Sequence, residues 1–138
     1  VKTGPEPEAV DFAKPYGGGP SAHGFDDYLA ISASLDMPPY VWLRHGRAVS
    51  QPTGWIEDSA SPKLWRAGVI SPDFDIAAVQ PRVTAETISF LERRAAATDG
   101  KPFFLYLPLA SPHTPVMLTP EFEGKTGTTP YGDFVAQV

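Results

Sequence analysis

The chain has 138 residues, a formal net charge of -5 and no cysteine. This length is enough for one ordinary domain. The lack of cysteine excludes disulfides, zinc–thiolate sites and a cysteine nucleophile from the chain itself. The acidic balance, without a basic stripe, argues against a nucleic-acid partner. No apolar run reaches the roughly 20 residues of a membrane span, so we expect no membrane partner either.

The 12 glycines and 16 prolines predict short elements joined by long, punctuated loops. Residues 1–22 show no sustained period and are expected to form an extended loop. Glycines 17–19 could suggest a phosphate cradle. However, neither a helix pattern nor a Lys-Ser/Thr pair follows them, as a P-loop requires, so a flexible loop is favoured.

Residues 23–82 are expected to hold a strand, a hairpin and a loop insertion. The segment 24–32 resembles a short strand. Residues 40–49 are typical of a hairpin, because His45 and Gly46 form a two-residue turn with glycine where a positive φ is needed. We expect His45, at the tip of that turn, to be solvated.

Two pairs of acids in this region are site candidates, Asp26 and Asp27 for a catalytic set and Asp73 and Asp75 for a metal, but neither pattern is specific. Asp26 and Asp27 are adjacent, so in a strand they point to opposite faces and cannot line one site together. Asp73 and Asp75 are not accompanied by further acids or by the glycine of a calcium loop. A surface loop is therefore favoured for Asp73 and Asp75.

Residues 83–138 are expected to form a helix, a strand, a loop and the start of a second helix. For the first helix, at 83–100, Thr84 suits the N-cap and Gly100 the C-cap. One apolar face is predicted, made of Ile88, Leu91 and Ala95.

The unbroken apolar run 103–107 is typical of a strand covered on both faces. A helix followed directly by such a strand forms half of an α/β crossover unit. A final amphipathic pattern at 131–138 predicts a second helix, and no stop signal follows it. We therefore expect a piece of a longer protein.

His113 is the strongest candidate for chemistry. It lies between Pro112 and Pro115, in the loop after the predicted strand, where ligands gather in open α/β sheets. Its polar neighbours are Ser111 and Thr114. A pre-positioned imidazole could donate a hydrogen bond to an anion or move a proton near neutral pH. A packed or solvated histidine is the alternative, because spacing alone completes no catalytic set.

Several segments together resemble the sulfatase family, of arylsulfatase-like type. The most specific are "KPFFLYLPLASPHTPV", with its proline-flanked "PHTP" loop, and "HGFDDYLAI" at residues 23–31. The segments "SASLDMPPYVWL", "VTAETISFLERRA" and "FEGKTGTTPYGDFVAQV" follow the order expected for that family. The resemblance covers most of the chain.

This resemblance implies an α/β fold, as part of an alkaline-phosphatase-like mixed sheet flanked by helices and incomplete in this chain. Residues 1–138 would be an internal fragment of one catalytic domain. The parent protein would be a sulfuric ester hydrolase, using a formylglycine nucleophile and a calcium ion. The histidine matching His113 would contact the sulfate ester, and it is both the catalytic and the substrate-binding residue implied here.

Other family features are missing from the sequence. It has no Cys/Ser-x-Pro-x-Arg motif and none of the family's acidic metal pairs. The resemblance therefore implies that calcium and formylglycine belong to the parent protein, and that this fragment alone is inactive and binds neither.

The expected partners are a small-molecule or carbohydrate sulfate ester, the missing parts of the same domain and a second copy in a homo-oligomer. The resemblance suggests a periplasmic, secreted or lysosome-like compartment. Two other readings stay open: a phosphoryl hydrolase or transferase of the alkaline-phosphatase-like superfamily, and a nonenzymatic binding or scaffold domain.

Overall fold

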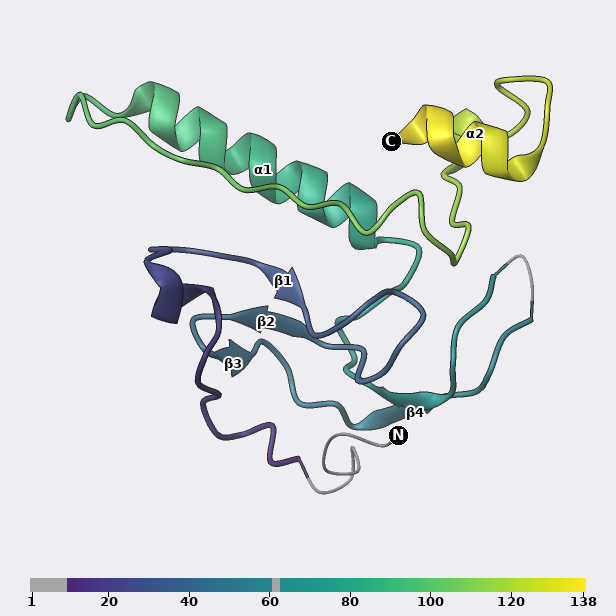
Figure 1. The fold of residues 1–138 in the computed structure, drawn as a ribbon, viewed down its shortest axis with the longest axis horizontal. Coiled ribbons are helices and arrows are strands. Elements are labelled where there is room, and N and C mark those ends of the chain that lie inside the picture. Colours follow the sequence, from purple (N-terminus) through teal and green to yellow (C-terminus); the bar gives the residue numbers. More distant parts are fainter. Residues whose placement is uncertain (1–9, 61–62) are drawn as a thin grey trace.

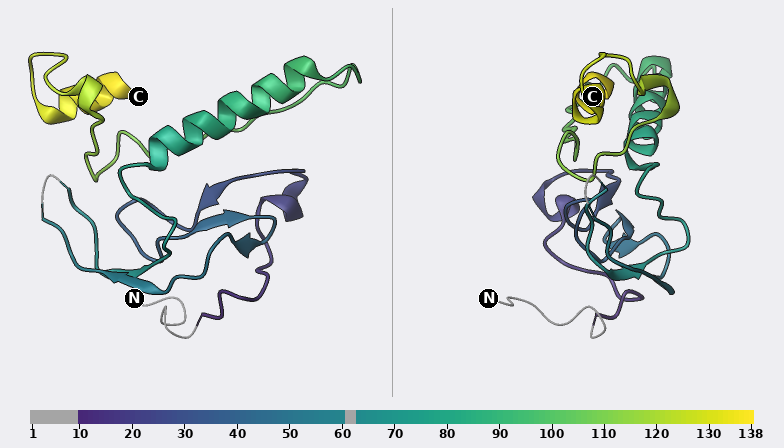
Figure 2. Two further views of the ribbon diagram at one scale, coloured as in Figure 1. Left: turned by 180° about the vertical axis from the view of Figure 1, so that it is seen from behind. Right: turned by 90° about the vertical axis from the view of Figure 1, so that its right-hand side faces the viewer.

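The computed structural model describes residues 10–60 and 63–138. Within these ranges the fold is mixed α/β, with two small antiparallel sheets on one side and two α-helices on the other (Figures 1 and 2). The α/β class predicted from the sequence is confirmed at this level. The larger alkaline-phosphatase-like sheet stays a prediction.

The first sheet has the strand order β1-β2-β3 and contains the predicted hairpin. Its strands are β1 (Ala30–Ile31), β2 (Trp42–Arg44) and β3 (Arg47–Ala48). The β2–β3 turn has positive φ at both central residues, 49° at His45 and 73° at Gly46. Two positive φ values are what the twist of a tight two-residue hairpin requires. The predicted hairpin is thus confirmed, whereas the predicted strand at 24–32 shrinks to β1.

A second sheet, which the sequence did not predict, pairs β4 (Gly54–Ile56) with β5 (Gly68–Ile70). Tyr40 links the two sheets through a parallel bridge to Ile70. Its N–H donates to the carbonyl of Val69 at 2.9 Å, and its own carbonyl accepts from Ser71 at 3.0 Å. The two sheets therefore share one hydrogen-bonded junction.

The hydrophobic core lies between this junction and the start of the first helix. Trp42 and Phe74 are in contact at its centre, with ring centroids 5.3 Å apart. The guanidinium of Arg82 lies 4.5 Å from the centre of the Trp42 ring, within cation–π range. The buried members of the core are Leu35, Tyr40, Trp42, Phe74, Ile76 and Val79.

The first helix, α1 (Val79–Ala96), starts and ends earlier than the sequence predicted. Its N-cap is Ala78, not Thr84, because Asp75 and Ile76 already accept the turn hydrogen bonds that lead into the helix. Pro81 is accepted in the first turn, where a missing N–H costs little. The C-cap is Ala97, not Gly100, which occupies a later turn with a φ of 64°.

The predicted buried strand at 103–107 is wrong in this structure. The segment is not assigned as a strand, and all five side chains are exposed. It runs alongside α1 (Figures 1 and 2), and no described strand pairs with its backbone. A strand cannot form without a partner for its N–H and C=O groups. The predicted apolar face of α1 is also open, because Ile88 and Leu91 are exposed.

The second helix, α2 (Pro130–Gln137), confirms the helix predicted at the end of the chain. The hydroxyl of Thr129 accepts from the N–H of Gly132 at 3.1 Å and caps it. Two short 3-10 helices, η2 (Pro20–His23) and η3 (Pro120–Phe122), complete the elements. In the described part of the chain, no helix is both long and apolar enough to cross a bilayer.

Candidate functional site

His113 lies in a turn just after the extended segment that follows α1. The N–H of His113 donates to the carbonyl of Ala110 at 3.2 Å, which closes this turn. Pro115 is buried, while His113 itself is exposed. The backbone is therefore anchored on both sides of a side chain that reaches solvent.

The hydrogen bonding of His113 distinguishes its two ring nitrogens. Nδ1 lies 2.7 Å from the carbonyl oxygen of Thr114. A carbonyl oxygen can only accept, so Nδ1 carries the hydrogen and donates it. In the neutral ring this leaves a lone pair on Nε2, and in the charged ring Nε2 becomes a donor. Nε2 is thus the atom that could meet an external group.

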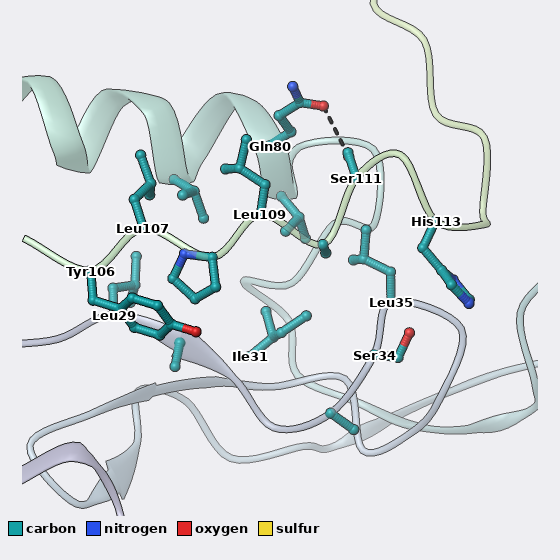
Figure 3. A pocket seen from close by; sticks show the side chains of 16 residues that line it. Leu29, Ile31, Ser34, Leu35, Gln80, Tyr106, Leu107, Leu109, Ser111 and His113 are labelled. Carbon is teal, nitrogen blue, oxygen red and sulfur yellow. Dashed lines mark hydrogen bonds between the residues drawn. The ribbon is translucent and has the colours of Figure 1, made fainter. Parts of the chain in front are cut away.

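A cavity of about 480 Å³ lies beside His113, between the β1 region, the start of α1 and the segment 106–111 (Figure 3). Its walls are mainly apolar. The polar side chains at one end are Ser34, Gln80, Ser111 and His113. A mostly apolar pocket with a few convergent polar groups is the usual form of a small-molecule site.

Asp36 places a negative charge near this end of the pocket. It is 9% exposed, and its Oδ1 atom has no hydrogen-bond partner within the described chain. The Ser34 hydroxyl beside it holds the pKa of the Asp36 carboxyl below its ordinary value. The charges of Arg66 and His113 act in the same direction, and burial opposes them. Asp36 therefore stays ionised and keeps a negative charge near this end of the pocket.

Ser111 connects the His113 turn to α1. Its hydroxyl is buried and donates to Oε1 of Gln80 at 3.1 Å (Figure 3). Ser111 was expected from the sequence as a polar neighbour of His113, whereas Ser34, Asp36 and Gln80 were not. These three are far from His113 in sequence. Ser34 and Asp36 lie in the sulfatase-like segment "SASLDMPPYVWL", but that likeness does not indicate a position beside His113.

The other residues considered from the sequence lie away from this pocket. His45 is exposed as expected, with Nε2 3.7 Å from Oδ1 of Asp27. Asp73 accepts from Ser71 at 2.8 Å, and Asp75 accepts from the N–H of Ala77 at 2.9 Å. Across the described residues, no three His, Cys, Asp or Glu side chains are grouped so as to hold a metal.

Comparison with curated proteins links the chain to one class of hydrolase. Four matches, all to arylsulfatases, support a sulfatase-family relationship over part of this chain. Arylsulfatase G of Rattus norvegicus is 28% identical over 113 residues, covering 73% of this chain and 21% of that protein. Arylsulfatase G of Homo sapiens is 26% identical over 125 residues, covering 82% and 23%.

The chain thus spans about a fifth of the length of the curated relatives it matches. No protein-family model matches it. No solved structure matches it significantly. The resemblance to sulfatases found in the sequence is therefore supported by these distant relatives.

Proposed function

We propose that this chain is a central part of a sulfatase catalytic domain, and that the complete protein hydrolyses sulfate esters. The observation that carries the proposal is the Nδ1–H donation from His113 to the Thr114 carbonyl at 2.7 Å, which leaves Nε2 free beside a pocket. The distant relatedness to Arylsulfatase G supports the reaction class.

In this proposal His113 acts at the leaving oxygen of the ester. Cleavage of the S–O bond moves an electron pair onto that oxygen, and an imidazolium Nε2–H can donate to it as the charge develops. The alcohol then leaves with the proton, and water supplies the hydroxyl that ends on sulfate. Asp36 supports this role because its ionised carboxylate places a negative charge near the end of the pocket where His113 lies.

The calcium ion and the formylglycine expected from the resemblance do not fit the described residues. No group of three or more suitable ligands lies together in them, and the sequence contains neither a cysteine nor a Ser-x-Pro-x-Arg motif. Both would have to come from other parts of the parent protein. The role proposed for His113 involves its own proton and does not depend on either group.

The test is turnover by the full-length protein that contains these 138 residues. We expect p-nitrophenyl sulfate to be hydrolysed with a kcat/KM at least 100-fold above that for p-nitrophenyl phosphate. A preference for the phosphate would favour the phosphoryl-hydrolase reading. Absence of turnover of either ester, in protein that is folded, would favour the nonenzymatic reading.

A further inference from the structure

We propose that Gln80 and Gln137 are positioning residues that clamp the two ends of the loop carrying His113. This inference rests on the proposed function for its effect on catalysis, but the clamp itself can be tested without activity. Gln80 lies in the first turn of α1 and Gln137 in the last turn of α2. Their side chains meet across the loop at residues 111–119.

Gln137 holds the far end of this loop. Its Oε1 accepts from the N–H of Thr119 at 2.8 Å, and its Nε2 donates to the carbonyl of Met117 at 3.2 Å. Because the first partner can only donate and the second can only accept, these two backbone groups fix which end of the amide is oxygen.

Gln80 holds the near end. Nε2 of Gln137 donates to Oε1 of Gln80 at 3.0 Å, so this atom of Gln80 must be the acceptor. The same oxygen accepts from the buried hydroxyl of Ser111 at 3.1 Å (Figure 3). Ser111 lies two residues before His113, so the chain of hydrogen bonds starts and ends on the segment that presents the imidazole.

The clamp joins parts of the chain that are distant in sequence. Gln80 and Gln137 are 57 positions apart. Two hydrogen bonds join them, and these are the only side-chain hydrogen bonds between α1 and α2 in the described residues. Both amides are only partly exposed. A loop fixed at both ends to two helices keeps its histidine in one place, and a misplacement of about 1 Å can cost a catalyst about 100-fold.

Because the donor and acceptor atoms of both amides are assigned, replacing glutamine by glutamate should have a larger effect at Gln137 than at Gln80. In Gln137→Glu a carboxylate oxygen would face the Met117 carbonyl and Oε1 of Gln80, and all three can only accept. Rotation of the Gln80 amide would relieve only the second contact. In Gln80→Glu both accepted hydrogen bonds survive, from Ser111 and from Gln137, and the lost contact is a long one of 3.4 Å to the Gln137 carbonyl.

The experiment uses the full-length protein with three variants, Gln137→Glu, Gln80→Leu and Gln80→Glu. The matched control is Gln51→Glu, at an exposed loop glutamine. We expect Gln137→Glu and Gln80→Leu to lower kcat for p-nitrophenyl sulfate by roughly 10- to 100-fold, with a smaller change in KM. Gln80→Glu should recover most of the loss seen in Gln80→Leu. Amide hydrogen exchange at 111–119 should become about tenfold faster in the two damaging variants.

Equal losses in Gln137→Glu and Gln80→Glu, or unchanged exchange at 111–119 in Gln137→Glu, would overturn the clamp. Exchange that speeds up everywhere, rather than in this loop, would also overturn it, because it would indicate general unfolding. If the wild type proves inactive on sulfate esters, the proposed function fails, and the exchange result alone decides whether the clamp exists.

Discussion

The ring of Phe90 on α1 meets the ring of Phe103 edge-on, with centroids 5.2 Å apart and planes at 85°. This contact holds the segment 103–107 alongside the helix as a second layer. Together, α1 and the segment 103–107 expose a broad apolar surface, since the side chain of Phe104 is 78% exposed and that of Ile88 is 50% exposed. Exposed apolar surfaces of this kind mark interaction sites, and contact with another polypeptide is one such interaction.

We therefore expect the 138-residue chain, made on its own, to self-associate. Sedimentation velocity at micromolar concentration should show oligomers, and Ile88→Glu should shift them towards monomer because it places a charge on the apolar surface. The exposed polar position Thr84 on the same helix provides the control, as Thr84→Glu. A monomeric wild-type chain with a sharp cooperative melt at high temperature would instead indicate a self-sufficient domain.

The isolated chain should also lack sulfatase activity. Hydrolysis requires a nucleophile and neutralisation of the departing charge. The sequence has neither a cysteine nor a Ser-x-Pro-x-Arg motif, and the described residues offer no metal-binding group. Purified chain should release no p-nitrophenol above the level of a His113→Ala sample. Release clearly above that level would show that the chain is sufficient for catalysis.

Gly68 in β5 should not tolerate a side chain. A methyl group there would collide with Cβ and Cγ of Pro38, and a proline ring cannot move aside. We expect Gly68→Ala to lower the free energy of unfolding of the full-length protein by about 1–3 kcal/mol, as overpacking does. The control is Gly17→Ala, since nothing lies within 4 Å of that position. Equal midpoints for both variants in urea unfolding would contradict the packing of β5 against Pro38.

Asp133 should make the α2 region sensitive to acid. Its carboxylate accepts from the N–H and hydroxyl of Thr126, both at 2.7 Å, and from the N–H of Gly124 at 2.8 Å. The Thr126 hydrogen bonds, supported by Gly124 and opposed by burial, hold the pKa of Asp133 below its ordinary value. The pKa of this carboxyl is lower in the folded protein than in the unfolded chain, where it is about 4. The ionised carboxylate therefore stabilises the fold above about pH 4, and this stability is lost as the pH falls through the pKa of the folded state.

Asp133→Asn should therefore lower the melting temperature at pH 7 and flatten its decline below about pH 4. Thermal unfolding of the full-length protein between pH 2 and 7 measures both effects, with exposed Asp26→Asn as the control. If the two variants melt alike across this range, the Asp133 hydrogen bonds do not support the fold.

The sequence predicted correctly those elements whose formation is determined by residues close together in the chain. The His45–Gly46 turn and α2 were found because a turn type and a capped amphipathic pattern each lie within about ten residues. The start of α1 was misplaced because Thr84 is a good N-cap by type, whereas Asp75 and Ile76 began the helix earlier. The apolar run 103–107 predicted a strand, but strand formation depends on a neighbour that the run itself cannot specify.

The candidate site was only partly predictable for the same reason. His113 was identified because prolines and a preceding apolar run flank it within one short segment. Asp36 and Gln137 approach it only through the fold, and nothing in their own surroundings in the sequence indicates this. The β4–β5 sheet was missed because each of its strands has three residues, which is too short to show an alternating pattern.

The central claim is that His113 supplies a proton at the leaving oxygen, and kinetics of His113→Ala in the full-length protein test it most directly. We expect kcat for p-nitrophenyl sulfate to fall roughly 100- to 10,000-fold, the range for a lost acid–base group. KM should change less, because the interaction forms mainly in the transition state. The control, His45→Asn, removes an exposed imidazole at a position with positive φ that asparagine accepts. A near-normal kcat in His113→Ala would contradict the account.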